Sequence, residues 1–282
     1  MATSAVQVAS GYPAYTTIRV SWAAESVLHV ELNRPNKLNS FIHKTWDDIY
    51  DCFKRAHKDA DVRCVVISST GRAFTAGLDL VEAFPPIDET DPPRRILLSQ
   101  AHCQEWQDVM SSLENCGKPV ICAINGACVG AGVDLITASN IRYATKDAYF
   151  CIKEIDIGLA ADVGTLNRFP KIMGNQSVLH ELAFTGRNLP ADEAYQIGLV
   201  GKVFATKEEM IAAAIKTASI IAEKSPVAVY STKNLLNFQR DHSVKDGLEY
   251  IKVWNTGGIL EIPTALEAAR KKQKAKYAKA RL

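Results

Sequence analysis

The sequence predicts an α/β core followed by a helical C-terminal region. Short continuous apolar runs such as "RCVVISS" (63–69) are typical of strands buried in a sheet. Glycine-containing turns follow two such runs, and segments with apolar residues at three- and four-residue spacing lie between them. From about Glu208 the pattern is almost wholly helical. We therefore divide the chain into a core over 1–205 and a helical region over 206–282.

The predicted elements follow in chain order. Strands are expected over 17–22 and 27–32, and then a helix, because apolar side chains recur at helical spacing from Phe41 to Phe53. The strand at 63–69 leads into a glycine loop at 70–80 and a Pro-rich acidic surface segment at 85–93. A long helix over 94–113 precedes a strand, a glycine turn and a helix over 118–139. Two short strands, 141–145 and 148–152, complete the core pattern before the helical region.

Composition excludes several classes of protein. The 282 residues carry a net charge of only +2, which gives no global case for binding nucleic acid or an anionic membrane. Seven scattered cysteines never form a C-x-x-C pair, and six histidines form no metal-binding spacing, so neither a disulfide framework nor a metal site is expected. No apolar stretch approaches a membrane span, and the N-terminus is too polar for a signal peptide. We expect a soluble intracellular protein.

Two glycine-bearing loops follow predicted strands, "FTAGLDL" (74–80) and "GACVGAGVDL" (126–135). Small residues there allow a ligand to approach main-chain N–H groups, and the second loop opens a helix whose N-terminus has free donors. The second loop lacks the G-x-G-x-x-G order of a dinucleotide site. The small side chains of Ala76 and Ala131 would let their amides point at one oxygen as an oxyanion hole, although spacing alone does not prove that the loops converge.

The stretch "KEIDIGLAADVG" (153–164) places acids in an apolar context. We expect Glu154 and Asp162 to be buried, which is costly for an unpaired carboxylate. Each acid also has a structural explanation. Asp162 could cap a short helix, and Glu154 could pair with Lys153 at the surface. Asp134 could interact favourably with the dipole of its own helix, near the N-terminus.

Two further acids are expected to be structural. Asp156 lies between two isoleucines, so strand alternation would turn it away from Glu154. Asp79 could cap a helix after the first loop while still bordering a ligand.

Four segments together resemble the signature segments of the crotonase (enoyl-CoA hydratase/isomerase) superfamily: "NRPNKLNS", "FTAGLDL", "NGACVGAGVDLITASNIRYAT" and "EIDIGLAADVGTLNRFP". The similarity covers about 15–260. It implies a crotonase fold, which is a spiral of ββα repeats, with a C-terminal helical region that builds a trimer, stacked further as a hexamer. It implies no cofactor, because CoA is part of the acyl-CoA thioester substrate.

The resemblance also implies roles for particular residues. Ala76 and Ala131 match the two positions whose amides bind the thioester oxygen, and Asp134 and Glu154 match two positions that hold glutamates in the hydratases. Asp162 has no acidic counterpart in the hydratases. The residues matched to the path of CoA and the acyl chain are Ala76, Gly77, Leu78, Asp79, Leu80 and Ala131.

The set of Asp134, Glu154 and Asp162 resembles the branch that converts 3,5-dienoyl-CoA to 2,4-dienoyl-CoA in the β-oxidation of unsaturated fatty acids. A proton leaves one end of the conjugated system and returns at the other, so two carboxylates are needed, and Glu154 and Asp162 are the candidates. Matching to the hydratases favours Glu154 at the α-carbon. Alternatives are a 2-enoyl-CoA hydratase, a Δ3,Δ2-enoyl-CoA isomerase or, more distantly, a non-catalytic crotonase-fold protein that binds RNA or a partner. The preferred acyl chain length is left open.

The C-terminal run "ARKKQKAKYAKARL" (269–282) is basic. We favour a solvated helical face over contact with CoA phosphates across a subunit boundary. The last three residues, Ala280-Arg281-Leu282, resemble the signal bound by the peroxisomal import receptor. A peroxisomal location is therefore expected, and a mitochondrial one is disfavoured because only one Arg occurs in the first twenty residues.

Overall fold

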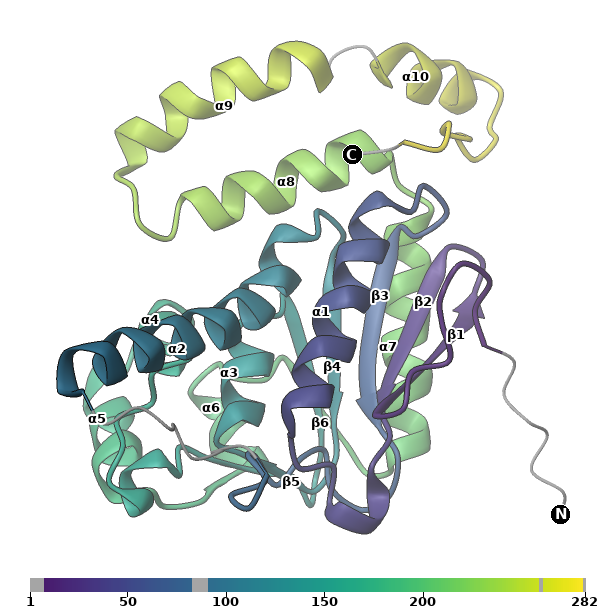
Figure 1. The fold of residues 1–282 in the computed structure, drawn as a ribbon. Helices are drawn as coiled ribbons and strands as arrows, with labels where there is room; N and C mark the ends of the chain where they lie inside the picture. Colours follow the sequence, from purple (N-terminus) through teal and green to yellow (C-terminus); the bar gives the residue numbers. More distant parts are fainter. Residues whose placement is uncertain (1–7, 83–90, 259–260, 281–282) are drawn as a thin grey trace, which may run out of the picture.

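The computed structural model describes residues 8–82, 91–258 and 261–280, with two sheets at its centre (Figure 1). The larger sheet has the strand order β1-β2-β3-β4-β6-β9, and the smaller has the order β5-β7-β8. In the larger sheet only the β1–β2 pair is antiparallel. The strands are β1 (Ile18–Ala24), β2 (Val27–Leu32), β3 (Cys64–Ser69), β4 (Val120–Ile124), β5 (Ala127–Val129), β6 (Ile141–Thr145), β7 (Tyr149–Cys151), β8 (Leu189–Pro190) and β9 (Lys202–Phe204).

Ten α-helices and three 3-10 helices occur in the described residues. The α-helices are α1 (His43–Lys58), α2 (Pro92–Asn115), α3 (Ala131–Thr137), α4 (Thr165–Arg168), α5 (Gln176–Thr185), α6 (Ala191–Gln196), α7 (Lys207–Ala222), α8 (Pro226–Phe238), α9 (Val244–Gly258) and α10 (Ile262–Arg270). The 3-10 helices are η1 (Pro35–Lys37), η2 (Glu154–Ile157) and η3 (Phe169–Lys171). The strands and helices predicted for the core are confirmed, with ends displaced by a few residues.

The chain winds as a spiral of repeats. Each repeat passes from a strand of the larger sheet to a short segment at the smaller sheet and then to a helix, as in β4, β5 and α3. The preceding repeat does the same after β3, because Thr75 bridges Cys128 in parallel before the chain reaches α2. Successive turns therefore stack, and the loops after β3 and β4 become neighbours.

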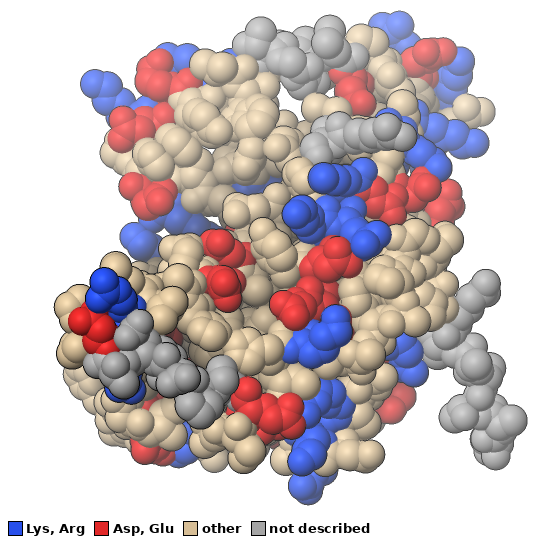
Figure 2. All heavy atoms as spheres, viewed as in Figure 1, with Lys and Arg blue, Asp and Glu red and all other residues tan. Residues whose placement is uncertain are grey.

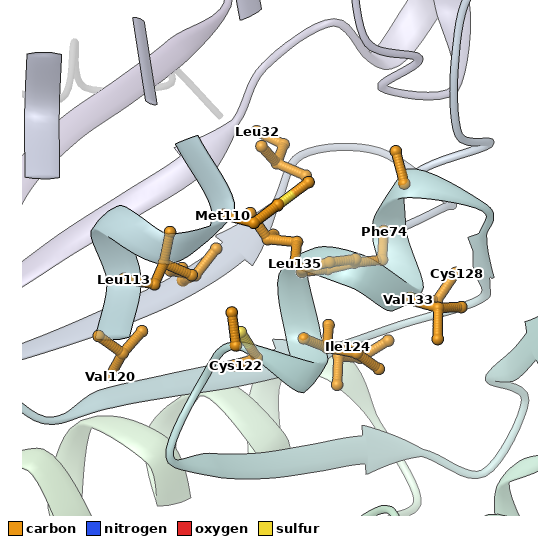
Figure 3. Packing of buried hydrophobic residues seen from close by; sticks show 14 of the residues in the cluster. Leu32, Phe74, Met110, Leu113, Val120, Cys122, Ile124, Cys128, Val133 and Leu135 are labelled. Carbon is orange, nitrogen blue, oxygen red and sulfur yellow. The ribbon is translucent and has the colours of Figure 1, made fainter. Parts of the chain in front are cut away.

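Helices cover both faces of the larger sheet, so its central strands are buried on both sides. Along β3, Val65 and Ile67 join the apolar cluster under α1, α2 and α3, whereas Cys64 and Val66 join the cluster under α7. This explains why the sequence of β3 is continuously apolar instead of alternating. Burying each aliphatic side chain contributes about 1.5–3 kcal/mol. Figure 3 shows side chains from α2, α3 and β4 in the first of these clusters.

The predicted boundary at 205/206 is wrong in its position. Helix α7 belongs to the core, because Met210, Ala214 and Ala218 are buried against the larger sheet. The change in character comes between Ala222 and Pro226, after which α8, α9 and α10 form a separate layer beyond one end of the sheet (Figure 1).

The basic tail is helical only as far as Arg270, so the predicted helical face is wrong for the residues that follow. The tail lies against the core. The Arg63 guanidinium donates to the carbonyl oxygens of Ala222 and Tyr277, and Lys279 forms an ion pair with Asp61. Arg281 and Leu282, which complete the predicted import signal, lie outside the described residues.

The described part of the chain can be examined for membrane spans, metal sites and disulfides. Within it, no helix is long and apolar enough to cross a membrane, and no group of His, Cys, Asp and Glu has the arrangement of a metal site. All seven cysteines are free thiols in the structure, and Cys103 alone among them is not buried. Basic and acidic residues are interspersed over the face shown in Figure 2.

Candidate active site

The two glycine loops lie side by side. The Thr75 amide donates to Ala127 O at 2.9 Å, and the Val129 amide donates to Thr75 O at 3.1 Å. Gly77 has a φ of +88°, and a Cβ on it would lie 2.9 Å from Val129 O. Glycine is therefore required at this contact, both for its backbone angle and for the close approach of the second loop. The two loops are therefore in direct contact, as the predicted site requires.

The structure changes one of the two predicted oxyanion donors. The Ala131 amide, at the first position of α3, has no acceptor among the described residues. The Ala76 amide, in contrast, donates to Leu38 O at 2.9 Å, so it is not free to bind a ligand. The prediction for Ala76 is wrong for this reason.

In the first loop it is the amide of Leu78, and not that of Ala76, that is available to a ligand. Its neighbours bond to Phe41 on one side, since the Phe41 amide donates to Gly77 O at 2.7 Å and the Asp79 amide donates to Phe41 O at 2.9 Å. In an extended segment successive amides point to opposite sides, so the Leu78 N–H points away from Phe41. It has no acceptor within the described residues. Leu78 in the first loop and Ala131 in the second therefore each offer an amide without an acceptor among the described residues.

Asp134 is the most deeply buried of the three acids, with 1% of its surface exposed. Its Oδ1 accepts a hydrogen bond from the Thr165 amide at 2.6 Å, and so it satisfies a donor at the start of α4. Burial raises the pKa of Asp134 to about 6, although this hydrogen bond and the Arg168 charge act in the opposite direction. Asp134 thus serves α4 in the way that a cap would.

The helix-cap alternative for Asp162 is therefore wrong. The residue at the cap position of α4 is Gly164, and the carboxylate that accepts from the start of this helix is that of Asp134 and not of Asp162. Asp162 is also exposed, contrary to the expectation that it is buried. Its charge nevertheless raises the pKa of both Asp134 and Glu154, which places the three carboxyls in one electrostatic cluster.

Glu154 begins η2, shortly after the strand β7 ends. Its Oε2 is buried and has no hydrogen-bond partner among the described residues. Its Oε1 lies 3.2 Å from the point that a Cβ on Gly130 would occupy, so the carboxyl adjoins the second loop. Burial, followed by the charge of Asp134, raises the pKa of Glu154 to about 7.

The surface-pair alternative for Glu154 is wrong as well. Lys153 forms its ion pair with Asp156, and both of these residues are exposed. Asp156 is thus structural, as expected, but it lies on a 3-10 helix and not on a strand. The side chain of Glu154 is left unpaired beside the loops.

Asp79 contacts residues of the segment before α1. It does not cap a helix within 79–82, contrary to expectation. Its carboxylate accepts from the Ser40 hydroxyl at 3.2 Å and lies 3.7 Å from the Arg34 guanidinium. Leu80, in the same loop, is 57% exposed. The roles of Gly77, Asp79 and Leu80 along a substrate path remain predictions.

Two residues near the acids were missed by sequence reasoning. Cys103 and Gln107, both on α2, contact Asp162. They precede it by 59 and 55 residues, and nothing in the local pattern of α2 distinguishes them. Only the packing of α2 over the segment around Asp162 makes the contact.

The family model for enoyl-CoA hydratase/isomerase matches residues 23–252. The chain belongs to this family. The human mitochondrial Δ(3,5)-Δ(2,4)-dienoyl-CoA isomerase is 49% identical over 244 residues, covering 86% of this chain and 74% of that protein. The peroxisomal enzyme of the same name from Arabidopsis thaliana is 37% identical and covers 90% of this chain and 93% of the relative.

Solved structures of the enoyl-CoA hydratase/isomerase family share the fold. An enoyl-CoA hydratase from Bacillus anthracis superimposes with a TM-score of 0.86 at 26% identity, covering 94% of this chain and all of that one. A protein from Streptomyces coelicolor, named a putative enoyl-CoA hydratase, gives the same TM-score at 25% identity, covering 96% of this chain and 98% of that one. The predicted crotonase fold is confirmed.

Proposed function

We propose that this protein isomerises 3,5-dienoyl-CoA to 2,4-dienoyl-CoA in the breakdown of unsaturated fatty acids. One observation carries the proposal. Three carboxyls, Asp134, Glu154 and Asp162, interact electrostatically, and Glu154 adjoins the second of two touching loops whose Leu78 and Ala131 amides have no acceptor among the described residues. Relatives named for this isomerisation, which are 49% and 37% identical to this chain, support it.

The first step is removal of a proton from C2, next to the thioester carbonyl. The electron pair of the broken C–H bond moves into the conjugated system and places negative charge on the thioester oxygen. The Leu78 and Ala131 amides stabilise this charge, and one such donor is typically worth about 3 kcal/mol. Both amides are fixed by the stacked loops, so little reorganisation is needed.

Glu154 is assigned to C2. Its Oε1 adjoins Gly130, the residue before Ala131. The Ala131 amide would bind the thioester oxygen, and C2 is bonded to the carbon that carries this oxygen. With a pKa of about 7, Glu154 is partly ionised at neutral pH and can both take and hold a proton. Asp134 contributes by raising that pKa and by fixing the start of α4.

Asp162 is assigned to C6, at the far end of the diene. After taking up a proton from solvent, the exposed Asp162 gives it to C6, so the double bonds move from C3 and C5 to C2 and C4. Glu154 then releases the proton from C2 to solvent, which returns both acids to their starting states. One proton leaves and one is added, and the reaction needs no redox partner and no cofactor. Plain hydration would need a water held between two glutamates, whereas this site has an aspartate at 134 and a further acid at 162.

The test compares two substrates. The pure protein is incubated with 3,5-octadienoyl-CoA, where the absorbance of the conjugated product is followed, and with 2-octenoyl-CoA, where loss of the enoyl absorbance is followed. The dienoyl substrate should be converted far faster. Efficient hydration of 2-octenoyl-CoA with no diene conversion would replace the isomerase with a hydratase.

We also propose that the protein self-associates through its C-terminal layer. Helix α9 exposes Leu248 (58%) and Val253 (77%), and α10 exposes Leu266 (54%). Apolar side chains gathered on neighbouring helices favour burial against another surface. A trimer, or two stacked trimers, is the assembly we expect.

For location we propose the peroxisome, through Ala280-Arg281-Leu282 and the import receptor. The Arabidopsis relative is named peroxisomal, while the human relative is named mitochondrial. A fluorescent protein fused to the N-terminus should collect in peroxisomes, and the same fusion lacking the last three residues should not. A full-length fusion that enters mitochondria or stays diffuse would contradict the proposal.

A further inference from the structure

The carboxyl of Asp162 has little support from its own segment. Residues 158–164 contain no helix or strand, and Gly164 has a φ of +138°. Among the described residues, the Cys103 thiol is the only hydrogen-bond donor to this carboxyl, with 3.6 Å between Sγ and Oδ2. A side chain that must deliver a proton to one carbon needs a more defined position than an exposed loop provides.

Helix α2 supplies that support from outside the segment. Cys103 and Gln107 are one turn apart and face the same side of the helix. The Gln107 amide group donates to Asp162 O at 2.7 Å, and its Nε2 lies 3.3 Å from the Cys103 sulfur. The two side chains thus contact both the peptide and the carboxyl of Asp162.

The thiol is suited to donate and not to react. Burial and the charge of Asp162 raise the pKa of Cys103, which keeps the sulfur protonated at neutral pH. An S–H group can donate one hydrogen bond to a carboxylate oxygen and leave the other oxygen unoccupied. Cys103 is therefore a weak nucleophile in this setting.

We propose that Cys103 and Gln107 are positioning residues for Asp162: Gln107 fixes its peptide, and the Cys103 thiol orients its carboxyl so that one oxygen is free for the substrate proton. This rests on the proposed function, in which Asp162 acts at C6. The two residues are assigned no contact with the substrate and act through Asp162.

The kinetic test uses Cys103→Ala, Cys103→Ser and Gln107→Ala with the dienoyl substrate. Misplacing a catalytic group can cost up to about a hundredfold, so Cys103→Ala and Gln107→Ala should lose about ten- to a hundredfold in kcat with KM nearly unchanged. Cys103→Ser keeps a donor and should recover most of kcat. Gln104→Ala is the matched control, since Gln104 is on the same helix but bonds to Asp108. A Cys103→Ala protein with unchanged kcat would overturn the proposal.

A second test does not depend on activity. Alkylation of Cys103 by iodoacetamide is followed against pH by peptide mass spectrometry, in the unmodified protein and in Asp162→Asn. Removing the neighbouring charge should move the alkylation profile of Cys103 to lower pH, while Gln104→Ala should leave it unchanged. Identical profiles with Asp162 and Asn would overturn the Cys103–Asp162 contact. Failure of the dienoyl assay alone would overturn the proposed function instead.

Discussion

Glu154 combines an apolar sequence context with an unpaired carboxyl. The burial that leaves its Oε2 without a partner also raises its pKa to about 7, from an ordinary value of 4.5. The folded protein therefore holds this proton more tightly than the unfolded chain does. Stability is highest below about pH 4.5 as far as this group is concerned, and falls as the pH rises through about 7.

Replacing Glu154 with Gln removes this pH dependence. We expect the variant to match the unmodified protein near pH 4 and to exceed it by roughly 2 kcal/mol above pH 7.5, a figure reduced from the full shift because the side chain is partly exposed. Urea unfolding at several pH values measures the difference. Asp156→Asn is the control: its carboxyl is exposed on the same 3-10 helix, so the difference should stay within about 0.5 kcal/mol. A Glu154→Gln protein with no increase in the free energy of unfolding at high pH would show that burial does not destabilise the ionised carboxyl.

At the residue scale, the sequence identified the three acids but not the surroundings of each. Asp162 was expected to be buried and is exposed, whereas Asp134 bonds to the start of α4. Ala76 was chosen for its small side chain, but an amide's availability depends on its hydrogen bonds, and Leu38 occupies it. These differences arise from contacts between segments distant in the chain.

At the scale of the elements, the important feature is the contact between the two stacked loops. Because the Leu78 and Ala131 amides belong to different turns of the spiral, their relative position depends on the contact at Gly77 and Val129. Any atom added at this contact should move the loops apart.

Gly77→Ala should therefore damage catalysis more than stability. The left-handed backbone costs about 1–2 kcal/mol for a non-glycine residue, and the added Cβ would lie 2.9 Å from Val129 O. We expect a loss of at least tenfold in kcat, because the Leu78 and Ala131 amides would move apart. Gly198→Ala is matched in φ, at +84°, but has no heavy atom within 4 Å of its Cβ, so it should lose similar stability and keep kcat. Equal kcat values for the two variants would argue against the loop contact.

At the scale of the whole molecule, α8, α9 and α10 form a layer beyond the sheet and expose apolar side chains (Figure 1). Light scattering at micromolar concentration should give a multiple of the 30.9 kDa chain mass. Introducing a charge by Leu248→Asp together with Val253→Asp should lower that mass, because a buried unpaired carboxylate is costly. Lys245→Asp, at an exposed polar position on the same helix, is the control. A monomeric mass for the unmodified protein would contradict self-association through this layer.

The sequence by itself indicated the α/β class through apolar periodicity and glycine turns. Its resemblance to the signature segments of the family supplied the spiral fold and the candidate acids at 134, 154 and 162. All of these signals are properties of short segments. Only the tertiary structure decided which amides are free, which acid is buried, where the helical layer begins and which residues of α2 contact Asp162. The physical reason is that hydrogen-bond partners and burial are shared between segments that are distant in sequence. Asp162 contacts Cys103, which lies 59 residues earlier, and no pattern within either segment encodes their contact.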